Sequence, residues 1–151
     1  MTQPSYPYDR RYATRYTFVS KGRKGAILKA VQFTPTSLKN ILNLSFGDLQ
    51  PGGRIDDTVN TNNNDIIRVI ATVIDIVNDF TSENPGIKIV FTGSSQARTS
   101  LYFRVLKMYG EVFSKTYVIT ALIKEDNLFT EVPFEPESGD EYSAFFISRK
   151  Q

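Results

Sequence analysis

The pattern of apolar and polar positions predicts the strands of this chain, some by alternation and others as short apolar segments. The segment RYTFVS (15–20) alternates in this way, and AILKAVQFT (26–34) returns as a second strand after a basic turn bounded by glycines, a pattern typical of a β-hairpin. Short apolar segments predict further strands at 41–46, 87–92, 117–124, 128–134 and 143–149. The residues Glu125, Asp126 and Asn127 separate two of these strands, so we expect a second hairpin there.

Helical periodicity predicts a core helix over residues 65–81 (DIIRVIATVIDIVNDFT). This segment is rich in Ile and Val, but its polar positions recur at spacings of four, three and four. One narrow polar stripe on an otherwise apolar helix is typical of a helix packed on a sheet. The stripe consists of Arg68, Thr72, Asp75 and Asp79.

A second helix is predicted over about residues 95–113. Its solvent-exposed side is expected to carry Ser100, Arg104, Lys107 and Glu111. Its buried side is expected to carry Leu101, Val105, Met108 and Val112, with Tyr102, Leu106, Tyr109 and Phe113 beside them.

The predicted order β-β-β-α-β-α-β-β-β indicates an α+β fold. We expect an antiparallel-rich mixed sheet with the two helices packed on one face. The length of 151 residues, without an internal repeat or a linker, predicts a single domain over residues 1–151. Residues 1–12 contain prolines and show no periodicity, so they are predicted to form an extended N-terminal arm.

The composition excludes several kinds of site. The chain has no cysteine and no histidine, which rules out thiol nucleophiles, histidine bases and Cys/His zinc sites. A metal would need oxygen ligands alone, and we expect neither a metal nor another cofactor. No apolar run approaches the roughly 20 residues that span a bilayer, and the first residues lack the apolar core of a signal peptide. We therefore expect a cytoplasmic protein without membrane contact.

Charge is divided unevenly along the chain, although the net charge is only +2. Residues 1–30 hold seven basic residues and one acid, whereas residues 125–141 hold seven acids and neither Lys nor Arg. Basic residues interleaved with tyrosines can grip a nucleic-acid backbone and stack on bases. The alternative, which the small net charge favours, is that the basic start pairs with the acidic segment within one chain or across a dimer. The tyrosines concerned are Tyr6, Tyr8, Tyr12 and Tyr16.

The junction between strand 87–92 and the second helix carries the candidate binding residues. Ser94 or Ser95 can cap the helix, and the N–H groups at a helix N-terminus favour an anion. Arg98 falls in or near the first turn, where a cation opposes the helix dipole unless an anion or a carboxylate lies close. The predicted anion site consists of Ser94, Ser95, Arg98, Thr99 and Tyr102, helped by Arg23 and Lys24 of the basic turn.

The polar segment 47–64 predicts a long loop with a tight turn at 51–53. Loops of this length in a compact domain are often functional. The candidate metal ligands or general bases in it are Asp48, Asp56 and Asp57. The same aspartates are candidate partners for an internal ion pair with Arg98, in which case the predicted anion site would be purely structural.

Several blocks spread over nearly the whole chain resemble a family of small uncharacterised bacterial proteins, found mostly in Bacteroidota. These blocks are KGAILKAVQFTP, NLSFGD, IDDTVNTNNND, TGSSQARTSLY and YSAFFISRK. The most specific is TGSSQARTSLY, a TGSSxARTxLY-type block. The family is a domain of unknown function, so the resemblance carries over no catalytic residue. It implies a cytoplasmic bacterial protein and, by analogy, an accessory or toxin–antitoxin-type role.

The function that the sequence favours is a non-catalytic module that binds an anionic partner, either a nucleic-acid backbone or a phosphorylated ligand. One alternative is a small metal-dependent nuclease or phosphoesterase that uses the loop aspartates. Another is a protein–protein interaction module that acts as a homodimer.

Overall fold

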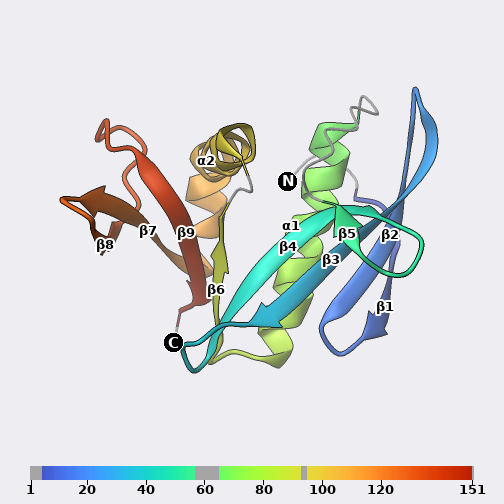
Figure 1. The fold of residues 1–151 in the computed structure, drawn as a ribbon, viewed down its shortest axis with the longest axis horizontal. Helices are drawn as coiled ribbons and strands as arrows, with labels where there is room; N and C mark the ends of the chain where they lie inside the picture. Colours follow the sequence, from blue (N-terminus) through green and yellow to red (C-terminus); the bar gives the residue numbers. More distant parts are fainter. Residues whose placement is uncertain (1–4, 57–64, 93–94, 151) are drawn as a thin grey trace. The chain divides into compact units, whose positions relative to one another are not determined.

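The structure is a computed structural model that describes residues 5–56, 65–92 and 95–150. It confirms an α+β fold, with a mixed, mostly antiparallel sheet and two helices (Figure 1). Neither helix is long and apolar enough to cross a membrane, within the described ranges. The elements are β1 (Tyr8–Tyr12), β2 (Arg15–Gly22), β3 (Gly25–Pro35), β4 (Ile41–Leu49), β5 (Ile55–Asp56), α1 (Ile66–Glu83), β6 (Lys88–Phe91), α2 (Gln96–Phe113), β7 (Tyr117–Glu125), β8 (Leu128–Pro133) and β9 (Tyr142–Arg149).

Contacts divide the chain into two compact units. The N-terminal unit consists of residues 1–34 and 44–84, and the C-terminal unit of residues 35–43 and 85–151. Strand β4 contributes to both, because its first three residues belong to the C-terminal unit. Each unit has its own helix and its own strands. The single domain over residues 1–151 stays a prediction.

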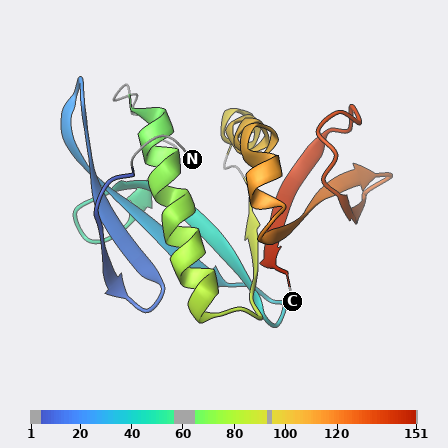
Figure 2. The ribbon, with the colours of Figure 1, turned by 180° about the vertical axis from the view of Figure 1, so that it is seen from behind.

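In the N-terminal unit, β1 to β4 pair in chain order and β5 pairs with β4. Helix α1 packs on one face, where the ring of Phe80 stacks on Phe33 at 3.9 Å between centroids and Tyr16 meets Phe33 edge-on. Because Tyr16 lies opposite Val31 and side chains alternate along a strand, even-numbered residues of β2 and odd-numbered residues of β3 face α1. We call the opposite side of these strands the outer face. Figure 2 shows α1 crossing the strands of its unit.

Two strands of this unit lie in segments that were predicted to be irregular. Residues 8–12 of the predicted arm form β1, which is antiparallel to β2. The two residues of β5 lie in the predicted loop 47–64 and pair with the end of β4. Between β4 and β5 the predicted tight turn is present, since Gly52 and Gly53 have φ of 93° and 90°, values that suit glycine.

In the C-terminal unit, the strand order is β4-β6-β9-β7-β8. Strand β6 runs parallel to the start of β4 and antiparallel to β9, and β7 lies between β9 and β8, antiparallel to both. Helix α2 packs through aromatic rings. Tyr102 meets Phe91 edge-on at 5.2 Å between centroids, and Phe103 meets Phe134 in the same way at 5.8 Å.

The predicted buried side of α2 is wrong in part. Met108 and Val112 are exposed, at 66% and 50%, whereas the buried residues of the helix are Tyr102 and Leu106. The four residues predicted to face solvent, Ser100, Arg104, Lys107 and Glu111, are all exposed, so the exposed side is wider than predicted and also includes Met108 and Val112. The reason is that aromatic side chains bury more apolar surface than Met or Val, so the side that carries the aromatic residues faces the strands.

Candidate functional site

The N-terminus of α2 has the capped geometry that the sequence predicted. The hydroxyl of Ser95 accepts a hydrogen bond from the backbone N–H of Arg98 at 3.2 Å, and the N–H of Thr99 donates to the Ser95 carbonyl at 3.0 Å. Ser94 lies outside the described residues. The first N–H groups of a helix have no acceptor within the helix itself, and this is the feature that favours an anion at such a terminus.

The other residues of the predicted anion site lie in two different environments. Tyr102 is 7% exposed and belongs to the packing of α2 on Phe91, so its side chain has a structural role. Arg23 and Lys24 belong to the N-terminal unit, where they are exposed at the tip of the β2–β3 hairpin. The α2 terminus belongs to the C-terminal unit and the hairpin tip to the N-terminal unit, so each is described within its own unit.

Two of the three candidate aspartates lie together on neighbouring strands. Asp48 of β4 is directly opposite Asp56 of β5, and Asp57 lies outside the described residues. Lys29 of β3 donates a hydrogen bond to Asp48 at 2.6 Å, and each of these two residues is 8% exposed. Buried ion pairs depend on both partners, because removing one leaves an uncompensated charge. In the part of the chain that the structure describes, no group of three or more acidic side chains could hold a metal ion.

Basic side chains gather on the outer face of the N-terminal unit. Arg15 and Lys21 are odd-numbered residues of β2 and therefore lie on this side, together with Arg11 of β1, whose Nε donates to the Thr17 hydroxyl at 3.1 Å. With Arg23 and Lys24 at the tip, they form what we call the basic face. The exposed apolar side chains Val19 and Leu28 lie opposite each other within it.

One end of the basic face is held in place by the turn between β4 and β5. The guanidinium group of Arg15 donates from Nε to the side-chain oxygen of Gln32 at 2.6 Å and from a terminal nitrogen to the carbonyl of Gly53 at 2.7 Å. This turn also carries the exposed Arg54. The first part of the polar segment 47–64 therefore contributes to the basic face through its contact with Arg15 and through Arg54.

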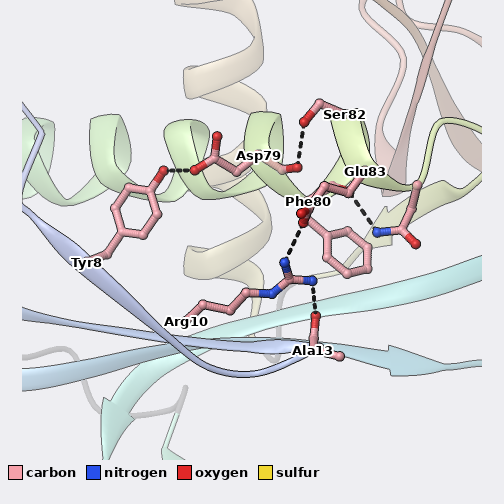
Figure 3. Close-up of polar contacts among 8 residues, drawn as sticks. Tyr8, Arg10, Ala13, Asp79, Phe80, Ser82 and Glu83 are labelled. Atoms are coloured by element: carbon pink, nitrogen blue, oxygen red, sulfur yellow. Dashed lines mark hydrogen bonds and ion pairs between the residues drawn. The ribbon is translucent and has the colours of Figure 1, made fainter.

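The tyrosines that alternate with the basic residues mostly point the other way. The backbone N–H of Tyr6 donates to the Thr72 hydroxyl at 2.8 Å, and its own hydroxyl donates to Asp65 at 2.6 Å. The hydroxyl of Tyr8 donates to Asp79 (Figure 3). Arg10, two residues farther along β1, is paired with Glu83 at 2.5 Å and also donates to the Ala13 carbonyl. Residues 6, 8 and 10 therefore line up along the polar stripe of α1.

Burial of these tyrosines has an electrostatic consequence. Burial raises the pKa of Tyr6, and the hydrogen bond to Asp65 raises it further. The pKa of Tyr8 is raised by burial and then by the hydrogen bond to Asp79. Tyr16, which is 2% exposed, also has a pKa raised by burial. These three phenols are parts of the fold, and of the interleaved tyrosines Tyr12 is the one with a widely exposed ring, at 70%.

Sequence reasoning missed this side-by-side arrangement of the arm and α1, although both patterns were visible. Positions 6, 8 and 10 repeat with the period of a strand, and the polar stripe of α1 repeats with the period of a helix. The sequence also suggested that the basic start pairs with the acidic segment 125–141. Two basic residues of that start have other partners, because Arg10 is paired with Glu83 and Lys29 with Asp48, both within the N-terminal unit.

The model of a family of unknown function (DUF6934) matches residues 2–150. No curated protein and no solved structure matches the chain.

Proposed function

The chain belongs to this family of unknown function, DUF6934, and we propose that it is a non-catalytic binding module that holds a nucleic-acid backbone on its basic face. The observation that carries the proposal is the separation of charge within the N-terminal unit. The register of β1, β2 and β3 collects basic side chains on the outer face. The acids Asp75, Asp79 and Glu83 lie on α1, which packs on the opposite side of the same strands.

The dimensions of the basic face suit a linear polyanion. Eight residues of β2 at about 3.3 Å each extend roughly 25 Å from Arg15 to the hairpin tip. One strand of a duplex carries a phosphate about every 3.4 Å, so a face of this length can contact several successive phosphates. Figure 1 shows the β2–β3 hairpin extending beyond the other strands of its unit. The two residues of its turn, Arg23 and Lys24, are exposed, so a nucleic-acid backbone can reach them.

The face also offers apolar contact for bases. Tyr12 at the β1–β2 turn is exposed and next to Arg11, and an exposed aromatic ring beside a cation is the usual stacking element of single-strand binders. Val19 and Leu28 add an exposed apolar strip in the middle of the face. A single strand therefore fits better than a duplex, whose bases are not available for stacking.

The proposal is tested by the salt dependence of binding to a fluorescent single-stranded 20-mer. Replacing Arg23 and Lys24 together by Ala should lower the slope of log K against log salt by roughly 1.4, because each neutralised phosphate contributes about 0.7 for a single strand. The matched control replaces Lys39 and Lys115, exposed lysines of the C-terminal unit, and should leave the slope unchanged. Absence of salt-dependent binding, or equal loss in both double variants, would contradict the proposal.

The same oligonucleotide separates this function from the catalytic alternative. Cleavage that requires Mg²⁺ and is lost on replacing Asp56 by Asn would support a nuclease instead of a binding module. A phosphorylated small ligand remains the candidate for the α2 terminus, where the Ser95 cap is the supporting observation. Its test is a thermal shift by inorganic phosphate that is lost in Arg98→Ala.

The setting that we propose rests on the family resemblance rather than on geometry. It is the cytoplasm of a bacterium, with an accessory or toxin–antitoxin-type role in which a nucleic-acid-binding module would serve. Fractionation of the native host is the direct test, and recovery in a membrane or secreted fraction would contradict it.

A further inference from the structure

Strand β8 is exposed on both of its faces. It is the last strand of its unit, with β7 as its one neighbour among the strands that the structure describes. Five of its six residues are exposed, including Leu128 at 71% and Phe129 at 57%. Figures 1 and 2 both show β8 at the outside of its unit, away from α2. Two exposed apolar side chains in sequence on an edge strand are a ready template for another strand.

The turn of the β7–β8 hairpin determines which backbone groups face the open edge. Asp126 and Asn127 both have positive φ, so they form a two-residue turn between the opposed residues Glu125 and Leu128. Hydrogen bonding alternates along an antiparallel pair, so Leu128 bonds to β7 while Phe129 and Glu131 direct their N–H and C=O groups outward. Pro133 has no N–H and ends the ladder.

Strand β1 is the corresponding edge of the N-terminal unit, with β2 as its one neighbour among the described strands. The Phe33 N–H donates to the Thr14 carbonyl, so Thr14 belongs to the hydrogen-bonded set between β2 and β3. Because this bonding alternates along a strand, the backbone N–H and C=O groups of Arg15 and Thr17 point toward β1 instead. In β1 the outward N–H and C=O groups are then those of Tyr8 and Arg10, with the same two-residue spacing as the outward groups of β8.

The segments that contain the two edges differ in charge, although Glu131, the one acid within β8, is paired with Lys88. Residues 125–141, which include β8, hold seven acids and neither Lys nor Arg. Strand β1 holds two arginines and one acid: Arg11 is paired with Asp9 of the same strand and Arg10 with Glu83, and the strand ends at the exposed Tyr12. Pairing of β8 with a second β8 would bring two acidic segments together, which like-charge repulsion opposes. Pairing of β8 with β1 brings an acidic segment with exposed apolar residues against a strand of the basic start with an exposed tyrosine.

We propose that β8 of one copy of this chain adds edge to edge onto β1 of a second copy. The contact is heterologous, because each copy contributes a different strand. Contacts of this kind build a ring of copies where the rotation closes and an open filament where it does not. The outward backbone groups supply the hydrogen bonds, and the exposed apolar residues supply the buried surface.

The test is a pair of charge-reversal variants studied by sedimentation velocity over a range of concentration and salt. Variant A carries Arg11→Glu, and variant B carries Glu125→Lys with Asp126→Asn, since asparagine tolerates the positive φ at position 126. The parent chain should self-associate, more weakly at high salt, and each variant alone should associate at least tenfold more weakly. An equimolar mixture of A and B should recover association, because the acidic β1 edge of A meets the basic β8 edge of B.

Two controls keep the outcome attributable to these strands. Replacing Leu128 and Phe129 by Ser should abolish association while the circular dichroism spectrum stays that of the parent, since both side chains are exposed. Replacing Arg23 and Lys24 by Ala should leave it unchanged, so failure of the nucleic-acid proposal and failure of this one are distinguishable. A parent chain that is monomeric at every concentration, or an A and B mixture that stays monomeric, overturns the proposal.

Discussion

Replacing Thr72 by Val tests whether the arm is held on α1 by hydrogen bonding. Thr72 is fully buried, and its hydroxyl accepts the Tyr6 N–H at 2.8 Å while donating to the Arg68 carbonyl at 2.8 Å. Valine keeps the shape and has a similar helix propensity, so the change removes the hydroxyl and little else. The Tyr6 N–H is then buried without a partner, which costs about 1–3 kcal/mol.

The expected loss is measurable as a fall in the melting temperature. For a chain of this size each 1 kcal/mol corresponds to roughly 2–4 °C, so Thr72→Val should melt about 2–12 °C below the parent. The control Thr72→Ser keeps the hydroxyl and loses a methyl group, which costs about 0.8 kcal/mol for the lost apolar burial.

Amide hydrogen exchange separates the two variants more sharply than stability does. The Tyr6 amide should stay protected in Thr72→Ser and exchange rapidly in Thr72→Val, because only the serine variant retains the acceptor. A protected Tyr6 amide in Thr72→Val, with an unchanged melting temperature, would refute the reasoning and assign the arm's position to the packing of the tyrosine rings.

Three further predictions concern ionisable and capping groups. Burial and the hydrogen bond to Asp79 raise the pKa of Tyr8, so its neutral form stabilises the fold below pH about 10, and this stabilisation is lost as the pH rises further. The melting temperature of Tyr8→Phe should therefore fall less steeply above pH about 10 than that of the parent. Parallel curves of melting temperature against pH would contradict this prediction. Burial raises the pKa of Glu131, but hydrogen bonds from Lys88 and from a threonine hydroxyl outweigh it, so the pKa is lowered overall. The ionised Glu131 therefore stabilises the fold at neutral pH, and this stabilisation is lost as the pH falls through the lowered pKa. Lys88→Met should thus destabilise the chain at pH 7, by at most about 1 kcal/mol because both groups are partly exposed, and equal destabilisation in strong acid would refute the assignment. Ser95→Ala should cost about 1 kcal/mol in urea unfolding, with recovery in Ser95→Asp, because the cap accepts an N–H of the first turn.

Local features of the fold were predictable because they depend on residues close in sequence. The helix predicted over residues 65–81 is α1, Ile66–Glu83, since a polar stripe at helical spacing is a property of the segment itself. The two hairpins also lie where glycine, aspartate and asparagine permit positive φ, as at Gly25, Asp126 and Asn127. The Ser95 cap belongs to the same class, because it needs only a residue and the turn that follows it.

The candidate sites were predictable only in their local parts. Helix α2 is capped by Ser95 as expected, whereas the burial of Tyr102 against Phe91 depends on how the helix packs on its strands. The basic face was not predicted as a surface, because its members come from two hairpins whose register decides which side each one occupies. A shift of one residue in that register would move every side chain of a strand to the other side.

The sequence by itself determined the fold class, the two helices and the tight turns, each of which follows from a short segment and its own periodicity. Only the tertiary structure decided the strand order, the parallel pairing of β4 with β6, and the match between the arm and the stripe of α1. The Tyr6 N–H and the Thr72 hydroxyl are 66 positions apart, and the partner that a buried polar group finds over such a distance is decided by how the whole chain packs.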